Sequence, residues 1–562
     1  MAETSSPTAK SSASWRFRIN SSTAKKLVQV ASEECQRAAQ KLRKPGLPKL
    51  FYLSYLIRDH EFFNVEARFG ALYKEDHYSR RNCLTDAHVG SFRKDQISEG
   101  GLEENSKEEE SYNYLGLPIH DRKEALRIGL WRLTDAKYRE AEEAYFRRKA
   151  HELTYLNLHP ELHDWEKRKP VVDLAPGSLP SIDREHWSRY VEKASATARN
   201  HPGIKNSHVS LQVKHQTRLF VNSDGSQIAE SQAFWQLEAY LWHLSEKGDG
   251  IPWTISHFVN DPSELPDLKQ IRREIRSAAQ LLEKVAAAPR FHSYSGPVLL
   301  DPIPAGLLIH EAMGHRLEGN RLRSGGEART FADSLGKTVL PEFLSLSDHP
   351  QDSHLVLPSG ESRSLVGHYR FDDEGTPSAT ADLISGGKLK GFLTSRVPIE
   401  RRHSSNGHAR SSHHERAISR MGVTHLESEH TATSRELKAK LLEEVKRQNL
   451  PYGIRILNAS SGETTTDAYD FQAFLGEINL AARVFPDGGE ELIRGVNFVG
   501  TPLNAVQGII AAGDDPVIDN AWCGAESGMV PVSTISPSLL IRNLELQSKA
   551  DTPYTQYFYP MP

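Results

Sequence analysis

The stretch GLLIHEAMGHRLEGN, residues 306–320, sets an apolar run directly before two histidines and two glutamates. It resembles the pattern H-E-x-x-H, in which two imidazoles four residues apart share one helix face and bind a metal ion. Here His310 and His315 are five residues apart, which on a regular α-helix rotates one side chain by about 140° from the other. A π-type turn inserts one residue and restores the alignment, and Gly314 is the residue that best tolerates such a distortion. The spacing therefore predicts a distorted helical turn at a metal site.

The neighbours of the two histidines favour a buried metal site over a solvated helix face. The apolar residues 307–309 come directly before the first histidine, and an exposed helix seldom carries such a run. Glu311 is a carboxylate that can take a proton from water at a metal ion and pass it to a leaving amine. Glu318 is either a partner that orients a ligand imidazole or a charge at the helix end. HExxxH alone is a loose pattern, and a decorated polar helix face is the alternative.

The composition is that of an ordinary globular protein. At 562 residues, with 38% hydrophobic and 25% charged residues, the chain is long enough for two or three domains. A net charge of -4 gives no general attraction to nucleic acid or to anionic lipid. No apolar stretch approaches the roughly 20 residues that span a bilayer, and the first 18 residues lack the apolar core of a secretory signal. We therefore expect a cytoplasmic protein without nucleic-acid or membrane partners.

Two domains of different character are predicted, with a boundary near residue 290. Residues 1–23, rich in Ser, Thr, Ala and Lys, are expected to form a disordered tail. Residues 24–290 mix helical and strand patterns, which indicates a mixed α/β domain. Residues 291–562 consist of short apolar runs between Gly, Pro, Asn and Asp, which is typical of a mostly antiparallel β domain, here with one notable helix that carries HEAMGH. The predicted fold class is α+β.

Hydrophobic periodicity gives the expected elements of the first domain. We expect helices at 24–43, 121–153, 183–200 and 268–288, and strands at 51–76 and 209–258 with an NSDG turn at 222–225. Asp183 is the expected N-cap of the third helix, and the acidic stretch 103–110 is expected to be a solvated loop. Three cysteines in a chain of this length are no disulfide framework, and Cys35 lies on the apolar stripe of the first helix.

Four segments of the second domain share their order and many of their residues with one known family. They are HEAMGHRLEGN (310–320), YRFDDEGTPSATADLISGGKLKGFLTSR (369–396), SNGHARSSHHERAISRM (405–421) and WCGAESGMVPVSTISPSLLIRNLEL (522–546). In turn they resemble the HExxxH segment, the DDEGT segment with its hairpin, the Asn-Gly-x-x-Arg stretch and the Cys-Gly block of the TldD/PmbA metallopeptidases. The resemblance covers roughly residues 295 to 546 and implies the two-domain fold of that family.

The resemblance also implies the ligands of a catalytic zinc ion. Cys523, 208 residues beyond His315, would join His310 and His315 and leave one position open for water, which is an accepted catalytic geometry for zinc. Glu311 would act as general base and then as general acid. Trp522, Cys523 and Gly524 are expected in a turn from which the thiol reaches the metal. The implied activity is that of a zinc metallopeptidase.

Substrate and partners follow from the same resemblance. It implies extended or unfolded peptides, bound like an added strand in a cavity between two subunits, and a homodimer or a heterodimer with a related TldD/PmbA chain. Two alternatives stay open: a non-catalytic partner subunit of such a dimer, and a metal-dependent amidase that acts on small substrates. The presence of Glu311 and all three ligands favours the enzyme. No G-x-S-x-G elbow, Walker loop or G-x-G-x-x-G pattern supports a serine hydrolase or a nucleotide enzyme.

Further candidates lie in the middle two segments. The four histidines between 403 and 414 follow no common ligand spacing, so this stretch is interpreted as an active-site loop and not as a second metal site. Within it, His408 and Arg410 are candidates to hold a substrate carbonyl or stabilise its oxyanion, the alternative being that Arg410 pairs with a surface acid. The acidic residues 372–374 either shape the cleft or form an ordinary turn.

The chain departs from the family pattern at two places close to the expected ligands. Ala525, Glu526 and Ser527 follow Cys-Gly where family members often have Lys and Gln, and Arg316 replaces a common Gly after the second histidine. These departures concern substrate contacts more than metal binding.

Overall fold

The computed structural model describes residues 14–15, 20–42, 45–97, 114–151, 159, 161–245, 248, 250–323, 329–358, 360–412, 415–464, 474–498 and 502–549. The predicted loop at 103–110 and the histidines at 413 and 414 lie outside these ranges. Helices and strands are both abundant, and the predicted α+β class is confirmed.

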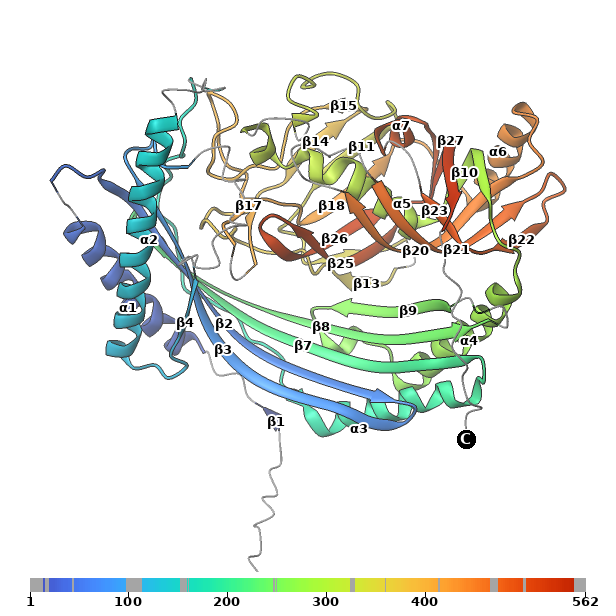
Figure 1. Ribbon diagram of the computed structural model, residues 1–562, viewed down its shortest axis with the longest axis horizontal. Coiled ribbons are helices and arrows are strands. Elements are labelled where there is room, and N and C mark those ends of the chain that lie inside the picture. Colours follow the sequence, from blue (N-terminus) through green and yellow to red (C-terminus); the bar gives the residue numbers. More distant parts are fainter. Residues whose placement is uncertain are drawn as a thin grey trace, which may run out of the picture.

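Long, curved strands form one sheet in the first half of the chain. The sheet has the order β4-β3-β2-β7-β8-β5, with β9 paired to β8, and only β5 and β8 run parallel. Its strands are β2 (Leu50–Arg68), β3 (Ala71–Val89), β4 (Tyr114–Leu117), β5 (Val172–Asp173), β7 (Ile204–Asn222), β8 (Gln227–Leu244) and β9 (Gly250–Val259). In Figure 1 they make a curved layer beneath the second half of the chain.

Helices cover the face of this sheet that points away from the second half. They are α1 (Ser21–Lys41), α2 (Lys123–His151), α3 (Arg184–Ser195) and α4 (Leu268–Ala287), followed in the case of α3 by a 3-10 turn, Ala196–Asn200. The carboxylate of Asp183 accepts a hydrogen bond from the backbone N–H of His186, so the predicted N-cap is confirmed. In α3 and α4 the apolar faces pack against buried sheet residues such as Trp235 and Leu237. Figure 1 shows these two helices below the sheet and α1 and α2 at its other end.

The predicted tail is partly ordered, which corrects its boundary at residue 23. Helix α1 begins at Ser21, with Asn20 as its N-cap. Further upstream, β1 (Ser14–Trp15) pairs antiparallel with β6 (Ile182–Asp183) just before α3. The composition of this segment is polar, but a short strand pairing and a capped first turn depend on backbone hydrogen bonds and need no apolar stripe.

Two sheets form the second half, from residue 293 to residue 548. The larger has the order β10-β20-β21-β23-β27-β24-β19 with β22 on β21, and the smaller has the order β15-β14-β11-β18-β26-β25. Most pairings are antiparallel, as predicted, while β10 with β20, β19 with β24 and β18 with β26 are parallel. The expected hairpin in the DDEGT segment is formed by β14 and β15.

The strands of the larger sheet are β10 (Ser293–Leu300), β19 (Thr431–Ala432), β20 (Gly453–Thr464), β21 (Phe474–Val484), β22 (Glu490–Ile493), β23 (Val496–Phe498), β24 (Ile509–Gly513) and β27 (Leu539–Ser548). Those of the smaller sheet are β11 (Leu344–Asp348), β14 (Ala381–Ser385), β15 (Lys388–Leu389), β18 (Val423–Ser428), β25 (Val517–Ala525) and β26 (Gly528–Ser536). Two separate pairs are β12 (His354–Val356) with β13 (Ser362–Ser364), and β16 (Ala409–Arg410) with β17 (Ile418–Ser419).

One short buried helix, α5 (Pro302–Ile309), lies between these two sheets. It contacts β20 of the larger sheet and β25 and β26 of the smaller one, and Leu308 and Ile309 belong to the main core of this half. Helices α6 (Ser434–Arg447) and α7 (Pro502–Gln507) complete this half. The position of α5 determines where the histidines of the HEAMGH motif lie, because its last residue is followed directly by His310.

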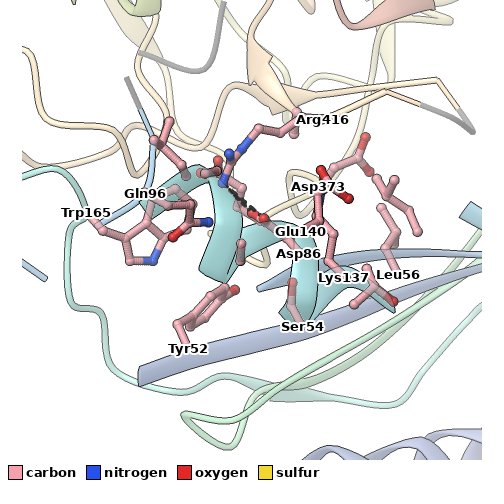
Figure 2. A pocket seen from close by; sticks show the side chains of 17 residues that line it. Tyr52, Ser54, Leu56, Asp86, Gln96, Lys137, Glu140, Trp165, Asp373 and Arg416 are labelled. Atoms are coloured by element: carbon pink, nitrogen blue, oxygen red, sulfur yellow. Dashed lines mark hydrogen bonds and ion pairs between the residues drawn. The ribbon is translucent and has the colours of Figure 1, made fainter. Parts of the chain in front are cut away.

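Among the residues that the structure describes, no sheet contains strands from both halves, and α4 ends at residue 287 before β10 begins at 293. We propose residue 290 as the boundary between two domains. Buried ion pairs join them: the carboxylate of Asp373 binds Arg58 of β2 at 2.9 Å and Arg218 of β7 at 2.7 Å. Figure 2 shows a second junction, where Arg416 reaches Asp86 of β3 beside a cavity of about 140 Å³.

Among the described residues, no helix is both long and apolar enough to cross a membrane.

Candidate metal centre

A π-helical turn follows α5 directly and carries the first histidine. It spans His310–Gly314, and a 3-10 turn, His315–Leu317, continues from it. The distortion predicted from the five-residue spacing is therefore confirmed. Because the π turn adds one residue, the rings of His310 and His315 lie side by side, with centroids 5.1 Å apart. Both side chains are buried.

Gly314 serves packing in this turn and not backbone freedom. Its φ of -53° and ψ of -58° are ordinary helical values that any residue adopts. A Cβ atom at this position would lie 2.0 Å from the sulfur of Met421, which is itself buried. The expectation that the glycine relieves backbone strain is therefore wrong, and the close approach of Met421 explains why the position lacks a side chain.

Strand β25 brings the third predicted ligand to the two histidines. The sulfur of Cys523 lies 3.2 Å from Nε2 of His310 and 3.5 Å from Nε2 of His315. One donor atom from each of the three residues lies within 4.8 Å of the others, and in the described part of the chain this is the one such group of three or more His, Cys, Asp or Glu residues. The predicted turn around Cys523 is wrong, because the residue lies within β25, at the edge of the smaller sheet.

The pleat of β25 separates Cys523 from its neighbour Trp522. Side chains alternate along a strand, so Cys523 packs with the core around α5, whereas Trp522 stacks on Phe258 and lies near Phe234 of the curved sheet. Trp522 also donates a hydrogen bond from Nε1 to the side-chain oxygen of Gln236 in β8, at 3.0 Å. The thiol therefore faces the histidines while the indole closes the gap to the first domain.

Positive charge around Cys523 makes its thiol acidic. Burial by itself raises the pKa of Cys523, but His310, Arg420 and His315 outweigh it and hold the pKa well below the ordinary value of 9.0. A guanidinium nitrogen of Arg420 lies 3.1 Å from the sulfur and also donates to the Cys523 carbonyl at 2.8 Å. A thiolate is both the nucleophilic and the metal-binding form of cysteine. The cluster thus presents a buried anion to two imidazole nitrogens.

Glu318 lies where a partner of the second histidine was predicted. Its carboxylate is 3.1 Å from Nδ1 of His315 and accepts hydrogen bonds from Arg321. Burial raises the pKa of Glu318, but His315 and Arg321 lower it to about 2, so the group is ionised. The pKa of His315 is raised to about 10, because the charges of Cys523 and Glu318 outweigh the effect of burial.

A cavity of about 950 Å³ opens onto these groups. His310, Glu311, His315 and Cys523 all line it. Strand β20 passes close to Glu311, where a Cβ atom at Gly462 would come within 2.8 Å of the Glu311 side chain. The predicted catalytic carboxylate is therefore next to the histidines and exposed to the same space.

His408 does not reach this cavity, which corrects its predicted contact with substrate. Its buried ring lies between the side chains of Asn406, at 2.8 Å, and Asp348, at 3.3 Å. Arg410 does not line the cavity either: it donates to the backbone carbonyls of Met421 and Pro531 and borders a different cavity. The Asn-Gly-x-x-Arg segment indicated that His408 and Arg410 are close in sequence, but it did not indicate the direction in which their side chains point.

The two departures from the family pattern both support the cluster. Arg316 donates from Nη1 to the backbone carbonyls of Glu311 and Ala312 in the π turn. Glu526 accepts hydrogen bonds from Arg321, the residue that also holds Glu318. Sequence reasoning missed these contacts and also Arg420. A signal for Arg420 was present, since it is the arginine of the Arg-Met pair that ends the third segment.

Comparison with known proteins gives matches to metalloproteases. Residues 293–548 match the PmbA/TldA metallopeptidase C-terminal domain. A metalloprotease from Synechocystis sp. is 29% identical over 61% of this chain and 68% of its own length. A metalloprotease from Archaeoglobus fulgidus is 28% identical over 47% of this chain and 56% of its own length. A zinc metalloprotease TldD homolog from Saccharolobus solfataricus is 25% identical over 44% of this chain and 51% of its own length.

Solved structures resemble the chain over nearly its whole length. TldE from Thermococcus kodakarensis has a TM-score of 0.60 at 12% identity, covering 92% of this chain and 100% of its own. A Thermotoga maritima protein described as a proposed modulator of a DNA gyrase has a TM-score of 0.62 at 13% identity. The match covers 92% of this chain and 99% of that protein's chain. At such identities the likeness shows a shared fold. It extends to both halves of the chain, including the curved sheet.

Proposed function

Because the chain is a member of the TldD/PmbA family, we propose that it is a zinc metallopeptidase that hydrolyses peptide bonds in extended or unfolded peptides. The observation that carries this proposal is the buried group of His310, His315 and Cys523, whose donor atoms lie within 4.8 Å of one another. Glu311 beside them supplies the carboxylate that such a hydrolase needs.

The chemistry of the donors suits zinc. Two imidazole nitrogens and one thiolate are accepted in its tetrahedral shell and leave a fourth position for water or substrate. The low pKa of Cys523 supports this, because the ligand form of the thiol is favoured. When bound, zinc supplies a Lewis acid that polarises a carbonyl and makes water a stronger nucleophile near neutral pH.

Residues of the chain itself transfer protons and orient the metal ligands. Glu311 takes a proton from the attacking water and later returns one to the leaving amine. The ionised carboxylate of Glu318 accepts a hydrogen bond from Nδ1 of His315, which leaves Nε2 as the donor atom that faces Cys523. Arg420 holds the Cys523 carbonyl and sulfur in position. His315 and Cys523 thus each have a partner that fixes their orientation.

Strand β25 offers a way to bind an extended peptide. It is the last strand of the smaller sheet, paired only with β26 within the described residues, and it borders the cavity through residues 519–524. The unpaired edge of a strand can pair with an added peptide, which places successive side chains on alternate sides. We propose this edge as the substrate platform, in a dimer formed with a second copy or with a related TldD/PmbA chain.

Metal content and peptide hydrolysis test the ligand set. We expect about one zinc per wild-type chain, and we expect Cys523→Ala to lose the metal together with at least about 99% of the activity, since a zinc hydrolase depends on its ion. Cys35→Ala is the matched control: this thiol is equally buried, but burial and nearby acidic groups raise its pKa, and it lies in α1 of the other domain. It should keep both metal and activity.

Other outcomes would replace the proposal. Zinc that remains on Cys523→Ala would show that the ligand set is wrong. A wild-type protein that binds no metal and cleaves no peptide would instead be a non-catalytic partner subunit. Cleavage restricted to small non-peptide amides would indicate an amidase.

A further inference from the structure

A second large cavity adjoins the metal centre. It has a volume of about 780 Å³ and lies between the curved sheet, at β2, β3 and β7, and the turn that joins β25 to β26. Trp522 and Gln236 line both this cavity and that of the metal centre, and they are hydrogen-bonded to each other. The pair is therefore a partition between two neighbouring spaces.

Basic side chains dominate the second cavity. Its described lining residues include the acidic side chains Asp76 and Asp373 and six basic ones, namely Arg58, Lys74, Arg80, Lys214, Arg218 and Arg410. Asp76 lies within 2.7 Å of Lys74. Asp373 is shared by Arg58 and Arg218, and Glu230 provides Arg218 with a second carboxylate. These two carboxylates pair with Arg58 and Arg218. Of the other basic side chains, Arg80 is exposed to solvent, which leaves Lys214 and Arg410 as the less exposed cations outside these ion pairs.

Within the described part of the chain neither Lys214 nor Arg410 forms an ion pair, although the charge of Asp373 acts on both. Arg410 uses its guanidinium to bind two backbone carbonyls and stacks on Tyr369 at 4.7 Å. The ammonium of Lys214 lies 5.3 Å from the ring centroid of Trp522 and 5.9 Å from that of Phe62. Burial and the charge of Arg58 lower the pKa of Lys214 to about 8. A partly buried cation without a counter-charge is costly, and an anionic ligand would relieve that cost.

The metal cavity has the opposite charge. Its titratable lining consists of Glu238, Glu311 and Asp519 together with the two histidines and Cys523, and no lysine or arginine is among its described lining residues. The carboxylates therefore line the metal side of Trp522, whereas basic side chains predominate beyond it. A bound peptide would experience this difference along its length.

We propose that the cavity beyond Trp522 is a carboxylate-binding subsite for the peptide substrate and that Lys214 is its specificity-determining residue. This inference rests on the proposed peptidase function. Lys214 is chosen because its three N–H donors make no hydrogen bond to another described residue. Arg410 is held by carbonyls, Arg58 and Arg218 are held by carboxylates, and Arg80 is exposed to solvent. The carboxylate comes either from an acidic side chain or from the C-terminus of the substrate.

A positional scan of unstructured peptides tests the subsite. Glu, Gln or Lys occupies each position of an otherwise neutral peptide in turn, and each peptide is prepared with a free C-terminus and as a C-terminal amide. With wild type we expect kcat/KM to be at least about tenfold higher for Glu than for Gln at one position, or for acid over amide, because a hydrogen bond to a charged group contributes that much. Which of the two contrasts appears identifies the source of the carboxylate.

Variants of Lys214 assign the preference to this residue. Lys214→Gln should reduce the ratio of rates for the preferred acidic peptide over its neutral match to about one, and Lys214→Glu should invert the ratio in favour of the Lys peptide. A gain of activity towards the Lys peptide cannot result from misfolding. Lys205→Gln is the matched control, since Lys205 lies on the same strand but lines neither of the two cavities. It should leave the ratio unchanged.

The outcomes separate this inference from the proposed function. Equal cleavage of Glu, Gln and Lys peptides by wild type would overturn the subsite while leaving the peptidase intact, as would an unchanged ratio in Lys214→Gln. If wild type cleaves nothing, calorimetric binding of the same peptides to the wild-type protein decides. Tighter binding of the carboxylate-bearing peptide that is lost in Lys214→Gln would support the subsite alone, and binding without such selectivity would overturn it.

Discussion

Three buried thiols in this chain differ in acidity because of their surroundings. Cys35, Cys83 and Cys523 are each less than 5% exposed. Burial raises the pKa of Cys83 to about 12, and that of Cys35 is also raised. At Cys523 the same burial is outweighed by two imidazoles and Arg420, so the pKa falls well below 9.0. Residue type alone therefore says little about whether a cysteine can bind metal, and neighbouring charge decides it.

At the same scale, the role proposed for Glu311 predicts a separation of binding from catalysis. Glu311→Gln keeps the size of the side chain and removes its capacity to accept a proton. We expect the variant to retain about one zinc per chain while kcat falls by about 10² to 10⁴-fold, the usual contribution of a general base. Metal analysis and steady-state kinetics on the same preparation check this.

The matched control for that experiment is Glu427→Gln on the exposed side of β18, which should behave as wild type. A Glu311→Gln variant that keeps its metal and loses less than about tenfold in kcat would show that another group carries the proton.

The sequence grouped residues correctly in space where a motif or the family resemblance connects them, and less well elsewhere. The spacing and the family resemblance indicated His310, His315, Cys523 and Glu318, and the structure brings all four together. The predicted contact of His408 with substrate was wrong because its ring turns towards Asp348. Asp348 is 60 positions away, and no local pattern connects it to His408. A long-range partner that neither a local pattern nor the family resemblance indicates becomes visible only in the folded chain.

At the scale of elements, the π turn was predictable and the position of β25 was not. A five-residue spacing of two ligands requires an inserted residue, so the distortion followed from helix geometry alone. Around Cys523, a turn was expected at 522–524. The hairpin instead turns a few residues later, between β25 and β26, where Gly528 has a φ of +81°. One glycine of several can make the turn, and the sequence does not say which.

Because the π turn packs against Met421, we expect alanine substitutions at two glycines of this region to differ in their effect on stability. Gly314→Ala brings a Cβ atom within 2.0 Å of the Met421 sulfur, so we expect the free energy of unfolding to fall by about 1 to 3 kcal/mol through overpacking. Met421→Ala should remove most of that cost in the double variant. Chemical unfolding of the two single variants and the double variant measures the coupling.

Gly306→Ala in the preceding helix α5 is the internal control. Its added Cβ atom would lie 3.5 Å from its nearest neighbours, an ordinary contact, so the variant should be as stable as wild type or gain up to about 1 kcal/mol from helix propensity. Equal losses in Gly306→Ala and Gly314→Ala would refute the role given to Met421.

For the whole molecule, the curved sheet supplies one wall of each cavity and the second half supplies the other. Figure 1 shows the second half lying in the concave side of that sheet. Asp373 joins them through Arg58 and Arg218, residues separated from it by 315 and 155 positions. The sequence predicted a boundary near residue 290 but not this contact, because a buried ion pair between distant residues has no periodic or compositional signal.

Histidines whose pKa is lowered by burial or partial burial predict a protein that loses stability in mild acid. Burial lowers the pKa of His215 to about 4, from an ordinary 6.5. A neutral buried histidine takes up a proton only after unfolding, so the stability that it contributes is complete above pH 6.5 and is lost as pH falls towards 4. The contribution of His215 amounts to about 3 kcal/mol at most. Burial likewise lowers the pKa of His77, His159, His208, His243, His368, His403 and His425.

Unfolding by urea at pH 7.5, 6.0 and 5.0 checks this for wild type and for His215→Phe. The free energy of unfolding of wild type should fall with pH, and the difference between the two proteins should shift in favour of the variant as the pH falls. Comparison at each pH cancels the titration of the metal ligands, which both proteins share. A constant difference across the three pH values would contradict the assignment to His215.

The third residue of the metal cluster is translated long after the two histidines, because Cys523 lies far from them along the chain. A ribosome completes His310 and His315 and incorporates Cys523 only 208 residues after His315. Strand β26, which holds β25 in the sheet, is translated later still. A nascent chain therefore exposes two histidines without their thiolate and cannot assemble the cluster until translation has passed β25. The proposed protease would thus be harmless to other chains on the same polysome until its own synthesis has passed that strand.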